Sequence, residues 1–356
     1  MKPIIKWAGG KEKELPIIKK YQPDQVDRLI EPFVGGGSVF LGLENTKNCI
    51  NDKSSELINL YECLKNKNKS FITHINYLFK KFSDIDDLVS KKDCCDLYKK
   101  KISINDFISK YKNSLVKIGE IDSNIFLKEV YRNLKSKLRR LEKIEIKNNT
   151  LSKDDIFINI ETALKSSFYM TVRYLYNYPE KYKLCKGKRA SIYFFIREYC
   201  YSSMFRYNKD GKFNVPYGGM SYNRKSLNNK INYITSKEVT NLLKKTDIKN
   251  LDFEDFLNIV EPKKNDFIFL DPPYDSEFSS YSGNSFGKNE QIRLRDYLLN
   301  TSAKFMLIIK NTDFIFNLYK NNKFYISDFD KKYMVSFMNR NNRDVKHLLI
   351  TNYEMR

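Results

Sequence analysis

The strongest constraint on the fold is the segment from Asp266 to Tyr274, which reads DFIFLDPPY. Four consecutive apolar residues are typical of a strand that is buried on both faces, as in a parallel sheet. Two prolines follow, and proline ends a strand because it lacks the amide proton that the ladder requires. The segment therefore predicts a central parallel strand over 266–270. Asp271 and Tyr274 would follow its carboxyl end, where open α/β sheets bind their ligands.

The loop after this strand predicts a site for an exocyclic amine. The carboxylate of Asp271 and the carbonyl of Pro272 can accept the two N–H groups of such an amine, while Tyr274 can stack on the ring that carries it. Pro272 and Pro273 fix the loop backbone that presents these acceptors. With both hydrogens bonded, the nitrogen lone pair turns toward an electrophile. On this motif alone, a turn with only a structural role is the open alternative.

A second candidate ligand site lies near the N-terminus. Residues 28–33 predict a short buried strand, Gly35 to Gly37 predict a turn, and a helix is expected from Ser38. A further strand over 49–52 and the helix after it complete a β-loop-α-β-α unit, the building block of open parallel sheets. The glycines allow a ligand to lie against bare backbone, and Asp52, at the end of the second strand, suits ribose hydroxyls.

The middle of the chain differs in composition from both ends. From about Glu62 to Arg189, Lys and Arg outnumber Asp and Glu by 29 to 16, glycine is nearly absent and no strand pattern persists. This pattern predicts a basic helical insertion, whose best helix covers about 124–147. One face of that helix is apolar, and the other carries Lys128, Arg132, Lys135, Arg139 and Lys143. The basic face is either an ordinary solvated surface or one that follows phosphates, and both interpretations stay open.

Residues 189–234 are rich in aromatic, basic and turn-forming residues, a mixture that suits a hairpin facing nucleic acid. Further strands are expected over 248–251, 305–310, 324–327 and 347–352. The sheet elements are thus split around a long middle, which predicts one α/β core with an inserted lobe. The expected parts are a core of 1–62 and 235–356, a basic helical insertion of 63–188 and a recognition hairpin region of 189–234.

The formal net charge of +21 exceeds what solubility requires, so we expect a polyanionic partner. A general compositional bias toward Lys, Asn and Ile is the alternative explanation. The six cysteines lack metal-binding spacing and only two histidines are present, so we expect reduced cytosolic thiols and no metal site. The N-terminus lacks an apolar signal segment, and charges interrupt every apolar run before it could span a bilayer. We therefore expect a cytoplasmic protein with no membrane partner.

Together these motifs resemble the Dam-type (D12 class) DNA adenine-N6 methyltransferases, which transfer a methyl group from S-adenosylmethionine. The glycine motif, the recognition region and the Asp-Pro-Pro-Tyr motif occur in the order typical of that family. The matching segments are 6–11 (KWAGGK), 31–37 (EPFVGGG), 51–52 (ND), 189–191 (RAS), 206–208 (RYN), 213–216 (FNVP) and 271–274 (DPPY). The resemblance implies a Rossmann-like, S-adenosylmethionine-dependent methyltransferase sheet with an inserted, mainly helical DNA-recognition lobe.

The resemblance also implies roles for individual residues. Catalysis is expected at Asp271, Pro272, Pro273 and Tyr274. Contacts with S-adenosylmethionine are expected at Trp7, Ala8, Gly9, Lys11, Phe33, Gly35, Gly37, Asp52, Phe253 and Asp271. Contacts with double-stranded DNA are expected at Lys6, Tyr201, Ser202, Met204, Arg206, Asn208, Asn214 and Pro216. For Trp7 and Phe253, packing in the core is the alternative role.

The expected reaction is direct methyl transfer to N6 of a flipped adenine. No cysteine lies in a Pro-Cys setting after a strand, which argues against a carbon-5 cytosine mechanism. A cytosine-N4 methyltransferase and a catalytically inactive DNA-binding relative are the alternatives.

The recognition sequence is less constrained than the reaction. Arg206 is expected to read a guanine bidentately. Ser202, Met204 and Met220 differ from the residues of the GATC-specific members, so we expect a site containing GA, with GATC as the leading candidate. The enzyme is expected to act as a monomer of bacterial or phage origin, alone or with a cognate restriction nuclease.

Overall fold

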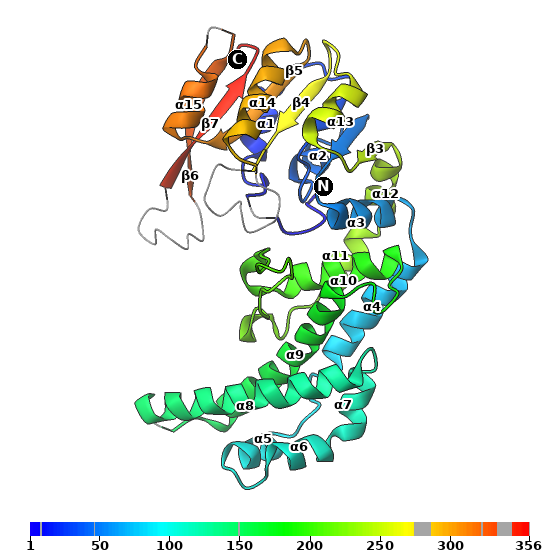
Figure 1. Ribbon diagram of the computed structural model, residues 1–356, viewed down its shortest axis with the longest axis vertical. Coiled ribbons are helices and arrows are strands. Elements are labelled where there is room, and N and C mark those ends of the chain that lie inside the picture. Colours follow the sequence, from blue (N-terminus) through cyan, green and yellow to red (C-terminus); the bar gives the residue numbers. More distant parts are fainter. Residues whose placement is uncertain are drawn as a thin grey trace. The chain divides into compact units, whose positions relative to one another are not determined.

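The computed structural model describes residues 1–355 except 8, 46, 149, 274–285, 322 and 333–343. The chain divides into two compact units. The first consists of Met1–Asn66 with Ile234–Arg356, and the second of Lys67–Tyr233 (Figure 1). The functional division of the second unit into 63–188 and 189–234 stays a prediction.

The first unit alternates helices and strands. Its N-terminal part contains α1 (Leu15–Tyr21), β1 (Leu29–Glu31), α2 (Ser38–Leu43), β2 (Asn48–Asn51) and α3 (Ser55–Lys65). After the second unit, the chain continues with α12 (Lys237–Lys244), β3 (Thr246–Lys249), α13 (Phe253–Val260), β4 (Phe267–Leu270), α14 (Lys288–Asn300), β5 (Lys304–Lys310), α15 (Asp313–Tyr319), β6 (Tyr325–Lys332) and β7 (Asp344–Thr351).

The strands of the described chain form a seven-stranded sheet in the order β3-β2-β1-β4-β5-β7-β6. All strands are parallel except β7, which pairs antiparallel with β5 and β6. In the centre, Ile268 of β4 lies opposite Ile30 of β1 and Phe305 of β5. The strand order reverses between β1 and β4, and the crevice outside the carboxyl ends at such a switch point is where doubly wound sheets bind ligands. The expected Rossmann-like fold class is confirmed.

The core of this unit lies where the apolar strands meet α13, α14 and α15 (Figure 1). Ile268 and Leu270 of β4 belong to one buried cluster with Phe256 of α13, Leu294 of α14 and Ile315 of α15. Burial of each such side chain contributes on the order of 1.5 to 3 kcal/mol. This packing fixes the position of the loop that follows β4.

The strands differ from the expectation mainly in length. β3 begins at Thr246 rather than at residue 248. The Thr246 hydroxyl also donates to the carbonyl of Leu242 (2.8 Å), near the end of α12. β6 and β7 are longer than the predicted 324–327 and 347–352, because they pair with each other as a long antiparallel ribbon. The pattern of apolar and polar residues along one strand cannot show how far its pairing with another strand extends.

The second unit is mainly helical, as expected. Its elements are α4 (Lys69–Ser83), α5 (Lys91–Tyr98), α6 (Ile104–Lys110), α7 (Lys112–Ile118), α8 (Ser123–Asn148), α9 (Lys153–Asn177), α10 (Lys186–Tyr199), the short 3-10 turns Tyr201–Ser203 and Met220–Tyr222, and α11 (Asn228–Ile234). A buried aromatic core holds these helices together, with Phe82, Phe168 and Phe195 in mutual ring contact. The helix predicted over 124–147 is α8.

The hairpin expected within 189–234 occupies only part of that range. Helix α10 extends to Tyr199, because its apolar side chains recur at helical spacing and are buried in the aromatic core. The hairpin is confined to 200–217, where Cys200 pairs with Tyr217 and Tyr207 pairs with Phe213, both antiparallel. We call residues 200–217 the recognition ribbon. Within the described ranges, no helix is long and apolar enough to cross a membrane.

Candidate active site

Asp271 lies directly after β4, where the sequence predicted it, and pairs with Lys11. Lys11 is only 2% exposed, and its ammonium group forms an ion pair with a carboxylate oxygen of Asp271. The same ammonium donates to the carbonyl of Gly9 (2.9 Å). The Asp271 side chain keeps 20% of its surface exposed, so it stays accessible. The N-terminal segment and the loop after β4 thus meet at one charged pair.

The loop after Asp271 is held from the side of α14. Gln291 is fully buried and donates its side-chain N–H to the carbonyl of Pro273 (3.2 Å). The Pro272 carbonyl accepts no hydrogen bond from a residue that the structure describes. The loop therefore has one anchored carbonyl and one available acceptor beside the Asp271 carboxylate. Tyr274, the fourth catalytic candidate, lies outside the described residues, as does Ala8.

Asp52, at the end of β2, organises the glycine turn. Its two carboxylate oxygens accept the backbone N–H of Gly35 (3.0 Å) and of Ser54 (2.9 Å). The hydroxyl of Tyr61 donates to the Gly35 carbonyl (3.0 Å). Gly35 and Gly37 have positive φ angles of 49° and 79°, which side chains rarely adopt. Asp52 therefore fixes the turn and stands beside it.

The glycines also have a reason within the chain itself. A Cβ on Gly35 would lie 2.9 Å from the Trp7 indole, one on Gly36 would lie 2.5 Å from the carbonyl of Ile5, and one on Gly37 would lie 2.6 Å from the Tyr61 hydroxyl. The glycine turn is thus the seat of the N-terminal segment, which adds a backbone bond from Ile4 to the Gly36 carbonyl (3.0 Å). The expected approach of a ligand to this backbone stays a prediction.

Phe33 and Phe253 belong to an aromatic group next to this turn. The Phe33 ring lies 5.6 Å from that of Phe253 and 5.4 Å from that of Phe286. Phe253 is 3% exposed and carries the Arg293 guanidinium 5.0 Å from its ring centroid. Phe253 therefore packs in the core, whereas Phe33 is only partly buried.

Two site residues were missed by sequence reasoning. Glu31, the last residue of β1, is 2% exposed, and one of its carboxyl oxygens has no hydrogen-bond partner in the described chain. Burial, followed by the negative charge of Asp271, raises its pKa well above the ordinary value, although a bond from the Phe40 backbone opposes the shift. An acid at the end of an apolar strand was the available signal, the same one that identified Asp271.

Asn51, at the end of β2, is the other missed residue. Its side-chain N–H groups donate to the carbonyls of Pro32 (3.1 Å) and Leu251 (3.0 Å), and its oxygen accepts from the Leu251 backbone (2.8 Å). It thus ties the carboxyl ends of three neighbouring strand segments together, including the one that leads to Asp52.

In the second unit, the predicted DNA-binding residues are brought together on the recognition ribbon. The Tyr201 backbone donates to the Pro216 carbonyl (2.9 Å), and the Tyr201 side chain is 44% exposed. Ser202 has a positive φ of 52°, a strained conformation that presents it at the surface. Met204 follows at a half-buried position. Asn208 caps the tip, because its side-chain oxygen accepts the backbone N–H of Lys212 (2.8 Å).

Arg206 is oriented within the ribbon. Its Nε donates to the side-chain oxygen of Asn214 (3.0 Å), and the rest of the side chain is exposed. The two terminal guanidinium nitrogens bond to no residue that the structure describes. This arrangement holds a fork of donors toward solvent. Lys6, the remaining predicted DNA contact, is exposed on the first unit.

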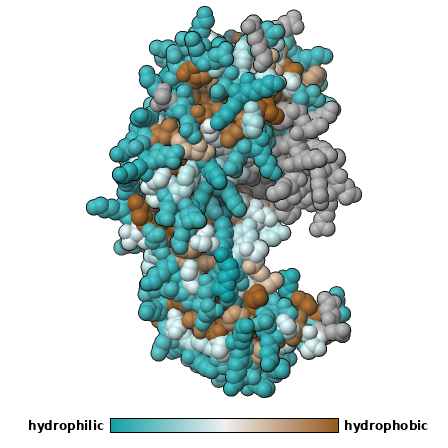
Figure 2. Space-filling model, turned by 180° about the vertical axis from the view of Figure 1, so that it is seen from behind, coloured by the Kyte–Doolittle hydropathy of each residue, from teal (hydrophilic) through white to brown (hydrophobic). Residues whose placement is uncertain are grey.

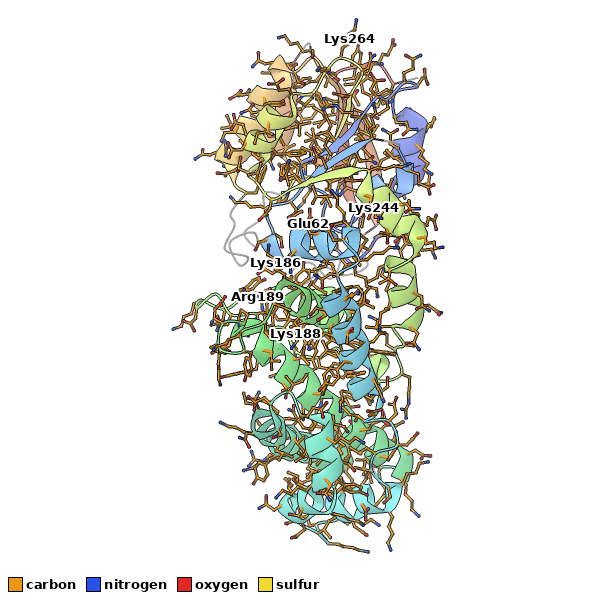
Figure 3. The ribbon with its side chains drawn as sticks, turned by 90° about the vertical axis from the view of Figure 1, so that its right-hand side faces the viewer. Glu62, Lys186, Lys188, Arg189, Lys244 and Lys264 are labelled. Carbon is orange, nitrogen blue, oxygen red and sulfur yellow. The ribbon has the colours of Figure 1, made fainter. Side chains whose placement is uncertain are left out.

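Basic side chains also gather at the start of α10. Figure 3 shows Lys186, Lys188 and Arg189 near one another there. Burial, and then the charge of Lys188, lowers the pKa of the neighbouring His74 to about 4, so this histidine is neutral at physiological pH.

On the face shown in Figure 2, hydrophilic residues predominate over both units. In the described part of the chain, no group of three or more His, Cys, Asp or Glu residues could hold a metal ion.

Acids at the carboxyl ends of β1, β2 and β4, around the switch point, place the protein among the Rossmann-like α/β enzymes. Comparison with known families defines it more closely. The family model for D12 class N6 adenine-specific DNA methyltransferases matches residues 7–118 and 117–335. The chain belongs to this family and is an adenine-specific DNA methyltransferase.

Named relatives agree with this result. The chain is 28% identical over 360 residues to the type II methyltransferase M.CviBI of Paramecium bursaria Chlorella virus NC1A, covering 99% of this chain and 100% of the relative. It is 28% identical over 372 residues to the type II methyltransferase M.MjaIII of Methanocaldococcus jannaschii, covering 99% of each. It is 26% identical over 330 residues to the DNA N-6-adenine-methyltransferase of Escherichia phage P1, covering 90% of this chain and 31% of the phage protein.

Proposed function

We propose that this enzyme transfers the methyl group of S-adenosylmethionine directly to N6 of an adenine flipped out of double-stranded DNA. The observation that carries the proposal is the position of Asp271. It follows β4 at the switch point, is paired with Lys11, and stands beside an available Pro272 carbonyl. Two rigidly held acceptors side by side match an amine with two N–H groups.

The donors and acceptors of the crevice fit the chemistry of S-adenosylmethionine, which supplies a methyl group on a positively charged sulfur. Asp52 lies beside the glycine turn at the end of β2, and its carboxylate is of the kind that accepts hydrogen bonds from ribose hydroxyls. The Lys11 ammonium suits the cofactor's carboxylate, and Asp271 suits its amine. The exposed side of Phe33 suits the adenine, with Phe253 supporting it from the core.

The same loop would orient the target base. Asp271 and the Pro272 carbonyl accept the two hydrogens of the amine, so that the nitrogen lone pair points to the methyl carbon. The N–C bond would form as the S–C bond breaks and leaves its electron pair on sulfur, and the methylated amine would then lose one proton to solvent. No covalent bond to the enzyme is needed. Because Gln291 engages the Pro273 carbonyl, the loop presents Pro272 rather than Pro273 as the second acceptor. The predicted stacking role of Tyr274 is part of this proposal.

The recognition ribbon supplies the proposed contacts with DNA. Arg206 would read a guanine, and Tyr201, Ser202, Met204 and Pro216 would contact the DNA. A site containing GA, with GATC as the leading candidate, follows from the resemblance. We further propose action as a monomer in the cytoplasm, with or without a restriction nuclease; the first two relatives described above are named type II methyltransferases.

Methylation with isotope-labelled S-adenosylmethionine tests the reaction and its alternatives. DNA treated with the purified full-length protein would be digested to nucleosides and analysed by mass spectrometry. We expect the label only in N6-methyl-2′-deoxyadenosine. Label in N4-methylcytosine would identify the cytosine alternative. Cofactor and DNA binding without label in any base would identify an inactive relative.

A further inference from the structure

Helix α9 carries five polar residues that recur at every fourth position. Residues four positions apart are offset by about 40° around the helix axis, so these five residues wind around about 24 Å of the helix. Every member bonds to the chain between Phe213 and Arg224, which contains the second half of the recognition ribbon. The five residues, called here the α9 stripe, are Glu161, Lys165, Tyr169, Arg173 and Asn177.

At one end, Asn177 pairs with Phe213 as a neighbouring strand would. Its side-chain N–H donates to the Phe213 carbonyl (3.0 Å), and its oxygen accepts the Phe213 N–H (2.8 Å). One turn earlier, Arg173 donates to the Val215 carbonyl (3.1 Å). Tyr169 donates its hydroxyl to the same carbonyl (3.0 Å). The ribbon backbone on both sides of Asn214 is therefore fixed by side chains of α9.

At the other end, charged groups bond to the chain that leaves the ribbon. The Lys165 ammonium donates to the Asn223 carbonyl and pairs with Asp86, both at 2.6 Å. Glu161 accepts from the Asn223 amide (3.2 Å) and from the Arg224 guanidinium (2.9 Å). These two members are almost fully buried, at 0% and 2% exposed for Lys165 and Glu161.

Stability alone is a weak reason for this arrangement. Buried ion pairs contribute little net stability compared with apolar side chains of similar size, because both charges lose their hydration. What the stripe does supply is direction, since hydrogen bonds to backbone carbonyls and amides fix orientation in a way that apolar contacts do not. The fixed segment includes Asn214, whose side chain accepts the Nε bond of Arg206.

We propose that the α9 stripe is a set of positioning residues for DNA sequence readout that do not contact DNA themselves. Tyr169, Arg173 and Asn177 fix the ribbon backbone around Asn214, and thereby the direction of the Arg206 fork. Lys165 and Glu161 hold the chain that leaves the ribbon. This rests on the proposed role of the ribbon in recognition. It also gives a function to the helical insertion, in which α9 serves as the support of the recognition ribbon.

Two substitutions test this inference in the full-length protein. Asn177→Ala removes both side-chain hydrogen bonds to Phe213. Tyr169→Phe removes only the hydroxyl of a buried ring, so we expect this variant to fold as wild type. The matched control is Asn159→Ala on the same helix, where the side chain bonds only to the carbonyl of Asp155 (2.8 Å). The readout is the ratio of kcat/KM on the preferred duplex to that on duplexes with one substituted base pair.

We expect that ratio to fall about tenfold in Asn177→Ala and about fivefold in Tyr169→Phe, on the scale of one or two lost hydrogen bonds. The dissociation constant for S-adenosylmethionine should stay unchanged in both, and Asn159→Ala should behave as wild type. An unchanged ratio in folded variants would overturn the inference, and so would equal weakening on all duplexes. If wild-type protein fails to methylate adenine, the proposed function fails instead, so the two failures are distinguishable.

Discussion

The ammonium group of Lys11 forms an ion pair with the carboxylate of Asp271, joining the first residues of the chain to the loop after the central strand β4. The N-terminal segment around Lys11 also packs on the glycine turn, through Trp7 and the backbone of Ile4. The proposed cofactor site and the proposed catalytic loop are therefore parts of one assembled structure. A substitution in the proposed cofactor site should therefore affect the proposed catalytic loop, and the reverse.

Removal of the Lys11 charge should weaken cofactor binding. Lys11→Met keeps most of the buried volume but leaves Asp271 without its partner and the cofactor carboxylate without a cation. We expect the dissociation constant for S-adenosylmethionine to rise at least about tenfold, which corresponds to about 1.4 kcal/mol. Calorimetric titration of the purified protein measures this. Lys13→Met, at an exposed position two residues away, is the control and should bind as wild type. Equal affinity in Lys11→Met would remove Lys11 from the site.

Glu31 should make the stability of the protein depend on pH. Its pKa in the folded state is raised above the ordinary value of 4.5 by burial and by Asp271. The folded state therefore holds a proton that the unfolded state has lost, and stability falls as pH rises above about 4.5 toward the folded-state pKa. Glu31→Gln carries no titrating group, so this part of the pH dependence should disappear.

Urea unfolding at pH 5.5 and pH 7.5 measures the effect. The loss of stability between these two pH values should be smaller in Glu31→Gln than in wild type. Glu238→Gln, at an exposed position, is the control and should retain the wild-type difference. The same pH dependence in wild type and Glu31→Gln would show that Glu31 titrates normally.

The exposed basic face of α8 should contribute to DNA binding. Among the described residues, Lys135, Arg139 and Lys143 form no ion pair, whereas lysines on other helices of this unit do, such as Lys91 with Asp154 (2.6 Å). If about five phosphates are contacted, the affinity should fall with salt with a log-log slope of roughly −4 or steeper. Replacement of Lys135, Arg139 and Lys143 by Gln should make that slope shallower by roughly 2 to 3.

The control for this test replaces three lysines that already have acidic partners. These are Lys91, Lys100 and Lys110, paired with Asp154, Glu142 and Asp93. Both triple variants lose the same formal charge, so a difference in slope reports on location rather than on net charge. Equal slopes in the two variants would favour the interpretation of the α8 face as an ordinary solvated surface.

Arg206 should act at one base pair. Because Asn214 holds its Nε, the terminal nitrogens are free to read a guanine bidentately. Arg206→Ala should cost about 1 to 3 kcal/mol on the preferred site and relax discrimination at that one position. Methylation of singly substituted duplexes at one salt concentration measures this, with Lys209→Ala at the exposed ribbon tip as the control. Uniform weakening on all duplexes would reassign Arg206 to a phosphate contact.

Local sequence patterns predicted the parts of the site that follow strands. The apolar run before Asp271 and the acid at Asp52 are short-range features, and both lie where expected. The pairing of Lys11 with Asp271 could not be predicted from spacing, because it depends on how the two ends of the chain meet in the sheet. The reason within the chain for these glycines was also hidden, since it lies in contacts with Trp7 and Tyr61.

The recognition ribbon shows the same limit. Turn residues predicted a hairpin, but they could not show that α10 extends to Tyr199 or that α9 supports the ribbon. The α9 stripe has no hydrophobic pattern of its own, and its polar residues would suit an exposed helix face equally well. Only tertiary packing distinguishes a buried polar stripe from a solvated one.

The central claim is that Asp271 acts on the target amine. We would measure methyl transfer by Asp271→Ala on DNA that contains the preferred site, with Asp255→Ala, at an exposed position of α13, as the control. Turnover of the folded protein should fall about 10² to 10³-fold in Asp271→Ala, because a preorganised acceptor is lost, while DNA binding stays largely intact. Turnover above about a tenth of the wild-type value in Asp271→Ala would contradict this account.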